Sequence, residues 1–414
     1  MVLVALTVST GCAAIAPRNV LPQAAASRSE LDGFDNIRFW GDGSAAEIGN
    51  AMAMDLHGPD SRLALAGEQR HSASNLLAIS GGAEKGAFGA GLLVGWSEAG
   101  DRPSFDLVTG VSSGALIAPF AFLGRERDNQ LREIFTSYGR QDIFTFNVPN
   151  LLEGAALADN SPLAGLIERY VDDAMISEIA TERRKGRLLL IGTTNLDTQR
   201  PVLWDMGRIA MSTNPEAKSL FRKILLASSA LPGIFPPVRI QVKLGQQSYD
   251  ELHVDGGVTR QIFIVPPALT LNASGRAVKP RLYVIRNGRI DPEWQPVNEN
   301  LVAITQRSLF TLIKNQSIGD LYRIYSETRR DGIDFNLASI PSDISETSNK
   351  PFDQAYMASL FDRAHQLASR HYNWSKQPPG FESAGRSVLA RMSQVDGRGA
   401  ARLAGAPSQH AVER

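Results

Sequence analysis

The stretch LLAISGGAEKGAFGAG, residues 76–91, decides the fold because it combines a short apolar strand, a run of small residues and the start of a helix. Glycine-rich turns between a strand and a helix let other groups approach the backbone closely. Such turns either cradle phosphates or supply backbone N–H groups to an oxyanion. The rest of the chain has to distinguish these two uses.

A phosphate-binding loop does not fit this stretch. Gly81 and Gly86 have the Walker A spacing, but Ala87 and Phe88 stand where that motif needs Lys and Ser or Thr. The dinucleotide fingerprint fails as well, because Ala83 replaces the second glycine, which lets a pyrophosphate approach. Nucleotide binding is therefore disfavoured.

Strands and helices alternate from residue 75 onward, which indicates a largely parallel sheet covered on both faces. The expected strands are 76–80, 105–110, 187–195, 201–206, 251–256, 281–288 and 332–340. The expected helices are 84–100, 114–124, 161–173, 216–229, one or two within 297–330, and 353–370.

A second glycine-bearing turn, GVSSG at residues 110–114, follows the second of these strands. The pattern G-x-S-x-G between a strand and a helix is typical of a nucleophile elbow, in which Gly110 and Gly114 leave room for a tight turn that exposes Ser112. Ser113 lacks this spacing, and we expect it to cap or pack the helix. Ser112 is thus the candidate nucleophile.

A catalytic serine needs a base, and two kinds of candidate follow it in the chain. His253, His365 and His371 are possible partners, although a packing role is expected for His253 and a surface or half-buried helical position for the other two. Asp255 ends a strand and precedes Gly256-Gly257, so its carboxylate can lie at the same sheet edge as Ser112. These residues leave both a Ser-His-Asp and a Ser-Asp arrangement open.

Together these motifs resemble the patatin-like phospholipases. That family combines a glycine-rich oxyanion loop, a G-x-S-x-G elbow and an Asp-Gly-Gly or Asp-Gly-Ala turn, which correspond here to residues 81–86, 110–114 and 255–257. A further similar block, LASSALPGIFPPV, lies at residues 226–238. The resemblance spans roughly residues 75–261 and keeps the family's order.

The resemblance implies a three-layer α/β/α sandwich around a mainly parallel sheet, and hydrolysis of lipid acyl esters by a Ser-Asp dyad through an acyl-enzyme. Ser112 would be the nucleophile and Asp255 the base, with Gly256 and Gly257 forming the aspartate turn. The substrate would be a phospholipid, a lysophospholipid or another acyl-ester lipid, and no cofactor is implied.

The same resemblance assigns the backbone N–H groups of Gly81, Gly82 and Ala83 to the oxyanion, with Lys85 and Gly86 supporting the loop. Ala83 departs from the family's glycine. A positive φ there would strain the loop, whereas the first residue of a helix tolerates a methyl group. We expect the second situation, with a helix from Ala83 to Glu98 whose positive end aids the oxyanion.

Composition adds limits on partners and location. The 43 basic and 43 acidic residues cancel, so no net charge directs the chain to nucleic acid. Cys12, the single cysteine, follows the apolar run MVLVALTVSTG and resembles a lipoprotein lipidation site, although no Lys or Arg precedes the run. This predicts a bacterial envelope protein anchored at a membrane surface, with a cytoplasmic location as the alternative.

The expected organisation is a signal segment at 1–20, an extension at 21–72, a hydrolase domain at 73–376 and a mobile tail at 377–414. No run of His, Cys, Asp and Glu has metal-ligand spacing, so no metal is expected. The alternatives are a Ser-His-Asp esterase using His253 or His365 and a non-catalytic envelope protein that binds a lipid or a partner. The oligomeric state is not predicted.

Overall fold

The structure is a computed structural model that describes residues 18–48, 74–146, 156–265, 279–344 and 348–381, apart from residues 27, 45 and 349. Cys12, most of the proposed signal segment and tail, and residues 49–72 of the proposed extension lie outside the described residues. The proposed domain boundaries therefore stay predictions.

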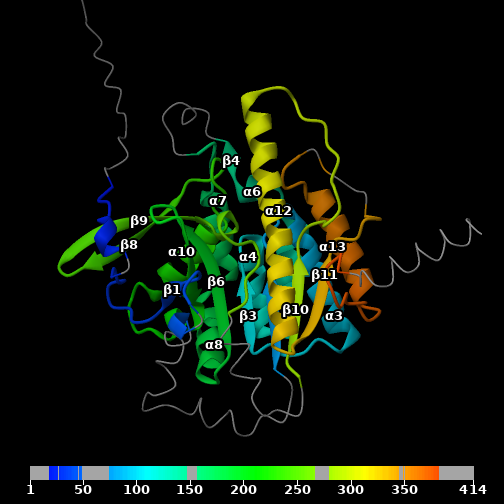
Figure 1. Cartoon of the computed structure of the whole chain (residues 1–414), viewed down its shortest axis with the longest axis horizontal. Coiled ribbons are helices and arrows are strands. Elements are labelled where there is room, and N and C mark those ends of the chain that lie inside the picture. The colour runs from blue at the N-terminus through cyan, green and yellow to red at the C-terminus, as the bar shows by residue number, and fades with distance from the viewer. Residues whose placement is uncertain are drawn as a thin grey trace, which may run out of the picture.

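A sheet with five parallel strands forms the centre of the chain (Figure 1). Its parallel part runs in the order β6 (Leu188–Asn195), β3 (Leu107–Gly110), β2 (Asn75–Ile79), β10 (Arg281–Arg286) and β11 (Asp334–Ser339). β7 (Arg200–Asp205) joins β6 in antiparallel fashion, and β1 (Arg38–Trp40) joins β7. A buried strand such as β2 is apolar along most of its length because both of its faces are covered.

A long hairpin extends this sheet beyond β6. It consists of β8 (Val238–Leu244) and β9 (Gln247–Asp255), and the end of β9 pairs with Thr193–Asn195 of β6. A separate pair, β4 (Thr145–Phe146) and β5 (Ala158–Asp159), completes the described strands. The hairpin brings Asp255 to the central sheet from the direction opposite to that of β3.

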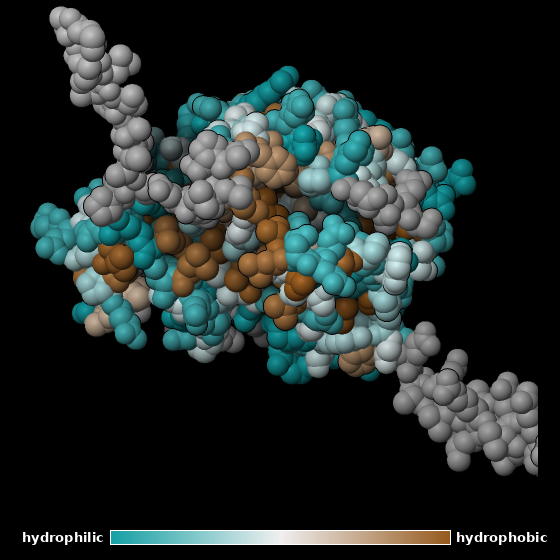
Figure 2. Space-filling view, turned by 90° about the horizontal axis from the view of Figure 1, so that it is seen from above, coloured by the Kyte–Doolittle hydropathy of each residue, from teal (hydrophilic) through white to brown (hydrophobic). Residues whose placement is uncertain are grey.

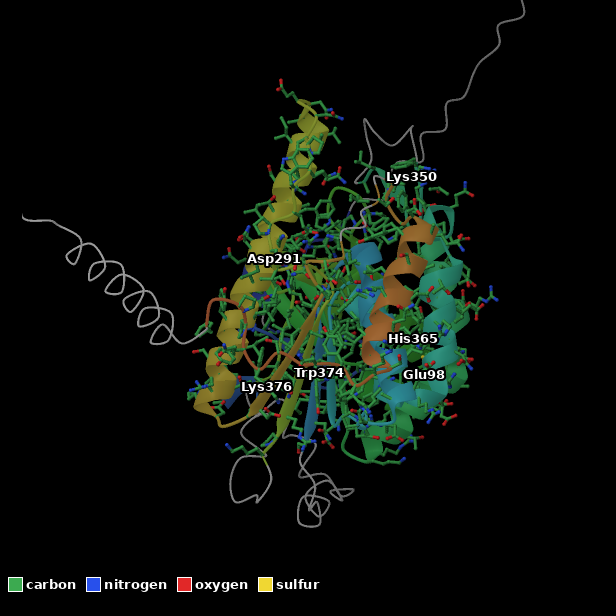
Figure 3. The ribbon with its side chains drawn as sticks, turned by 90° about the vertical axis from the view of Figure 1, so that its right-hand side faces the viewer. Glu98, Asp291, Lys350, His365, Trp374 and Lys376 are labelled. Atoms are coloured by element: carbon green, nitrogen blue, oxygen red, sulfur yellow. The ribbon has the colours of Figure 1, made fainter. Side chains whose placement is uncertain are left out.

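Helices cover the sheet unequally, as Figures 1 and 3 show. One face carries a single long helix, α12 (Leu301–Arg330), which packs against residues 262–265 and the strands. The other face carries α3 (Gly86–Ala99), α4 (Ser113–Leu123), α5 (Asp128–Ser137), α7 (Ser161–Tyr170), α8 (Asp173–Arg184), α9 (Met206–Met211), α10 (Ala217–Ser228) and α13 (Gln354–Ala368). The short helices are α6 (Arg140–Ile143), η1 (Gln23–Ala25), η2 (Ala83–Lys85), η3 (Arg125–Arg127) and η5 (Gly256–Val258).

Small residues explain why α3 packs so closely on α13. A Cβ atom added at Gly91 would lie 2.2 Å from the carbonyl oxygen of Phe361, and one at Gly95 would lie 2.3 Å from that of His365. Only glycine permits this backbone approach, so the glycines of the opening stretch also fix α3 against the outer helix.

The expected α/β fold is confirmed: helices flank a mainly parallel central sheet. Every strand and helix listed from the sequence is present, and residues 297–330 contain one helix. The sequence prediction missed α5, α6, α8, α9, β1, β4, β5 and β8. The helix expected at 84–100 is divided, because the tighter η2 precedes α3.

Candidate active site

Ser112 occupies a tight turn between β3 and α4. Its backbone has φ 55° and ψ −127°, a conformation that is strained for a residue with a side chain. A Cβ atom at Gly114 would lie 2.4 Å from the carbonyl oxygen of Ile79, and one at Gly110 would lie 2.5 Å from that of Gly114. The two glycines of the elbow are therefore required by close backbone contacts.

Asp255 reaches Ser112 because two strands approach each other along the same edge of β6. Gly110, the last residue of β3, pairs with Ile191, and Asp255, the last residue of β9, pairs with Thr193. Only Gly192 separates these two positions on β6. The nucleophile elbow and the aspartate turn consequently meet at the carboxyl end of the sheet.

Gly256 and Gly257 allow the aspartate turn to pack against the nucleophile elbow. A Cβ atom at Gly256 would lie 2.4 Å from the carbonyl oxygen of Gly192, so the turn fits only without a side chain. Gly257 donates its backbone N–H to Asp255 Oδ1 at 2.7 Å.

The Asp255 carboxyl is buried, and the Ser112 side chain lies close enough to it to affect its pKa. Burial raises this pKa to about 6, while Ser112 and the hydrogen bond from Gly257 act in the opposite direction. Burial dominates because taking an ionised carboxylate out of water is expensive. The result is a carboxylate more basic than an ordinary aspartate, beside a serine hydroxyl.

The glycine-rich loop lies directly beside this pair. A Cβ atom at Gly81 would lie 2.9 Å from Ser112 Cβ, and one at Gly82 would lie 2.2 Å from the carbonyl oxygen of Asn287. Ala83 begins the short helix η2, as expected, but its φ is 51°. The expectation that Ala83 avoids a positive φ is therefore wrong, because this residue both starts a helix and turns the loop.

Gly86 lets the loop pack on the elbow helix, since an added Cβ there would lie 2.9 Å from Ser113 Cβ. The Lys85 side chain is held by an ion pair within the protein. Its ammonium forms an ion pair with Glu293 at 2.6 Å, and Glu293 also pairs with Lys314 of α12 at 3.0 Å. Lys85 thus connects the loop to the segment between β10 and α12.

Three further side chains hold the site, and sequence reasoning missed them. Asn287, just after β10, donates from Nδ2 to the Ser80 carbonyl oxygen at 2.8 Å and accepts from the Gly89 N–H at 3.0 Å. Ser228 Oγ accepts from the Ser112 N–H at 3.0 Å. The Asn-Gly pair at residues 287–288, just after β10, was the one local signal for Asn287.

The third is Gln261, whose side-chain amide lies between the glycine loop and the aspartate turn. A Cβ atom at Gly81 would lie 2.5 Å from Gln261 Oε1, and one at Gly257 would lie 2.0 Å from Nε2. The Gln261 backbone N–H donates to the carboxylate of Asp320 on α12 at 2.9 Å. α12 therefore helps to position the loop on which this amide sits.

The histidines considered from the sequence have other partners. Both ring nitrogens of buried His253 are engaged, one with Thr193 Oγ1 and one with Glu251 Oε2, each at 3.0 Å. His365 pairs with Glu98 at 2.7 Å, as Figure 3 shows. Glu98 lies twelve residues after Gly86 on α3, which places it about 18 Å along the helix from the site.

His371 pairs with Asp101 at 3.1 Å and lies just beyond α13, whereas His365 lies in the last turn of that helix. In the part of the chain that the structure describes, no group of three or more His, Cys, Asp and Glu side chains is placed to hold a metal ion. Within the same residues, no helix is long and apolar enough to cross a membrane.

A half-buried elbow serine, a buried aspartate and a glycine loop at one edge of an α/β sheet define a hydrolase-like site. Comparison with known proteins finds a family model that matches this part of the chain. Residues 77–267 match the model of the family described as patatin-like phospholipase. The resemblance found in the sequence is therefore confirmed over these residues.

Two solved structures are similar to the chain at a distance. VipD from Legionella pneumophila is 12% identical, with 73% of this chain and 68% of that chain covered at a TM-score of 0.31. Human GIVD cytosolic phospholipase A2 is 10% identical, with 83% of this chain and 64% of that chain covered at a TM-score of 0.34. No curated protein matches the chain.

Proposed function

We propose that the protein hydrolyses acyl esters of phospholipids or lysophospholipids through a Ser112-Asp255 dyad and an acyl-enzyme. One observation carries this proposal: the sheet places the Ser112 elbow beside the buried Asp255 carboxyl and the glycine-rich loop, and Ser112 acts on the pKa of that carboxyl. The lipid-hydrolysing family of residues 77–267 supports the substrate class.

In the first step, Ser112 Oγ attacks the ester carbonyl carbon while its proton passes to Asp255. The carbonyl π electrons move to oxygen, and when the tetrahedral species collapses the alcohol or lysolipid leaves with that proton. Water then attacks the acyl-enzyme, gives its proton to the same carboxylate and releases the fatty acid after Ser112 recovers its hydrogen. A base with a pKa near 6 is better matched to neutral pH than an ordinary aspartate.

Backbone N–H groups of the loop at residues 81–83 would stabilise the oxyanion. The loop contacts Ser112 through Gly81 and continues into η2 and α3, whose partial positive charge points to the same region. Removing one preorganised donor to an oxyanion typically reduces the rate by about 100- to 1,000-fold. This contribution explains why small residues are concentrated in the opening stretch.

A histidine is not needed in this mechanism. His253 is engaged through both nitrogens, and His365 lies at the far end of α3 from the loop. The Ser-His-Asp esterase considered from the sequence therefore gains no support from the arrangement of these side chains.

Access to lipid would come through the amino-terminal half of α12, which projects past the catalytic edge of the sheet in Figure 1. Trp294 and Leu301 are 88% and 82% exposed. Figure 2 looks onto this end of the molecule and shows hydrophobic patches across its centre. Trp294 precedes α12, and the exposed apolar residues of the helix besides Leu301 are Val302, Ile304, Phe310 and Leu312.

Residues 301–313 contain a single charged residue, Arg307. A large exposed apolar surface of this kind marks an interaction site, and indole rings favour the membrane-water interface. We therefore propose that the apolar rim, formed by Trp294 and the exposed apolar residues of α12, contacts the lipid surface while the site takes up an acyl chain.

A covalent anchor would act in the same direction. We propose that Cys12, which lies outside the described residues, is lipidated and tethers the enzyme to the cell envelope. Tethering raises the effective concentration of the enzyme at the bilayer without new contacts. Mass spectrometry of the native amino terminus tests this proposal, and an unprocessed Met1 with unmodified Cys12 would remove the anchor.

The decisive assay is fatty-acid release from phospholipid and lysophospholipid vesicles by the wild-type chain and by Ser112→Ala and Asp255→Asn. Ser113→Ala is the matched control, because Ser113 Oγ is buried and makes no hydrogen bond. We expect release by the wild type and the control and none by the other two variants. Release that persists in Ser112→Ala or Asp255→Asn would refute the dyad.

A further inference from the structure

Arg286 is an unusual residue at the edge of the candidate site. It ends β10, one position before Asn287, and its side chain is 4% exposed. Its Nε donates to Ser317 Oγ of α12 at 3.0 Å, but its buried Nη1 has no hydrogen-bond partner. Leaving a buried donor of a charged group without a partner is costly. This nitrogen can therefore gain stability by donating a hydrogen bond to an anion.

The neighbouring charges leave an excess of positive charge at this place. Glu293 is the acidic residue whose charge acts on Arg286, yet its carboxylate is already shared by Lys85 and Lys314. Lys85 of η2 and Lys314 of α12 therefore pair with one carboxylate whose charge also acts on Arg286 of β10. Burial lowers the pKa of Arg286 to about 10, so it stays charged at neutral pH.

The backbone keeps this group next to the oxyanion loop. The Arg286 guanidinium lies against Gly288, where an added Cβ would be 3.0 Å from Nη1. Asn287, between them, contacts Gly82 through its carbonyl oxygen and binds Ser80 and Gly89. Lys314 lies one turn before Ser317 on α12, so both face the end of β10.

We propose that Arg286 and Lys314 form a subsite for a phosphate group, which binds at the unpartnered Nη1 and competes with Glu293 for the surrounding cations. In a glycerophospholipid the phosphate is a few bonds from the ester carbonyl, so a headgroup phosphate could occupy this subsite while the ester meets Ser112. The assignment of the phosphate to a lipid headgroup rests on the function proposed above, whereas phosphate binding itself does not.

Binding is measured by isothermal titration calorimetry on the full-length Ser112→Ala chain, which separates it from hydrolysis. The probes are inorganic phosphate, the free diester glycerophosphoglycerol, and monomeric dihexanoyl phosphatidylglycerol with dihexanoylglycerol as its phosphate-free counterpart. We expect Lys314→Met to weaken binding of the phosphate-containing probes by about tenfold, because a charge-assisted contact is lost.

Glu293→Gln distinguishes the possibilities better, since it removes the competing charge and should tighten phosphate binding by several-fold. If Glu293 had a purely structural role, the same substitution would weaken phosphate binding. Arg307→Met is the matched control, because Arg307 holds the same segment through the Glu293 carbonyl oxygen and Gln295 Oε1. It should leave phosphate affinity unchanged.

The probes distinguish the two sources of the phosphate. Tighter binding of the diester and of phosphatidylglycerol, but not of dihexanoylglycerol, in Glu293→Gln would support a headgroup subsite. If Glu293→Gln tightened the binding of inorganic phosphate alone, this would support a site for the free ion. No phosphate binding by folded protein, weaker binding in Glu293→Gln, or full affinity in Lys314→Met would overturn the subsite.

Discussion

Replacing Asp255 by asparagine should inactivate the enzyme and at the same time stabilise its fold. The pKa of Asp255 is about 6, against an ordinary value of 3.8. Each pKa unit corresponds to about 1.4 kcal/mol, so keeping this carboxylate ionised in the folded protein costs about 3 kcal/mol. Asparagine has nearly the same shape and carries no charge.

The sign of the pH dependence follows from linkage. A carboxyl with a higher pKa in the folded state binds its proton more tightly there, so its contribution to stability is greatest at low pH. That contribution is lost as the pH rises from about 4 to about 6. Asp255→Asn should therefore exceed the wild type by about 3 kcal/mol at pH 8 and by about half of this at pH 5.

Urea denaturation at both pH values measures the two differences. Asp205→Asn is the contrasting variant, because Asp205 is equally buried but ion-paired with Arg183 at 3.0 Å. Its substitution should be destabilising, since it removes the charge that pairs with the buried Arg183 guanidinium. A lower stability of Asp255→Asn at pH 8 would refute the conclusion that burial outweighs the effects of Ser112 and Gly257 on this carboxyl.

Four further outcomes follow from the site. The kcat/KM for a soluble ester should fall about tenfold per pH unit below pH 6, because Asp255 must be ionised to act as a base, and a flat profile from pH 4 to 7 would contradict this role. Ala83→Gly should raise the unfolding free energy by about 1 kcal/mol in urea titrations, because it relieves a positive φ, and should retain activity. Asn287→Ala should lower kcat by about 100-fold with little change in KM, since it loosens the glycine loop, and an unchanged kcat would argue against this positioning role. His365→Ala should keep wild-type kcat/KM, and a large loss would revive a histidine base.

The sequence was sufficient for the parts of the site that depend on local backbone requirements. Gly110 and Gly114 are needed at fixed distances from Ser112, so the elbow could be read from five residues. The alternation of apolar strands and helices predicted the sheet and its covering helices for the same reason. Asp255 was recognised by its place at the end of a strand before two glycines.

Contacts between distant segments could not be read in this way. Asn287 holds the glycine loop only because β10 and β2 are neighbours in the sheet, a pairing across more than two hundred residues. Lys85 was expected to support the glycine-rich loop, and its pairing with Glu293 depends on the course of the chain before α12. Ala83, which has a positive φ, follows Gly82, and Gly82 packs against the Asn287 carbonyl group in another long-range contact.

The role of Ser112 as the nucleophile is tested most directly by covalent capture. Active protein is treated with an alkyl fluorophosphonate, which loses fluoride as a serine oxygen bonds to phosphorus, and the modified peptide is identified by mass spectrometry. The account predicts one phosphonyl group on Ser112 of the wild type and no labelling of Asp255→Asn. Modification of another serine, or none in protein that releases fatty acid, would contradict it.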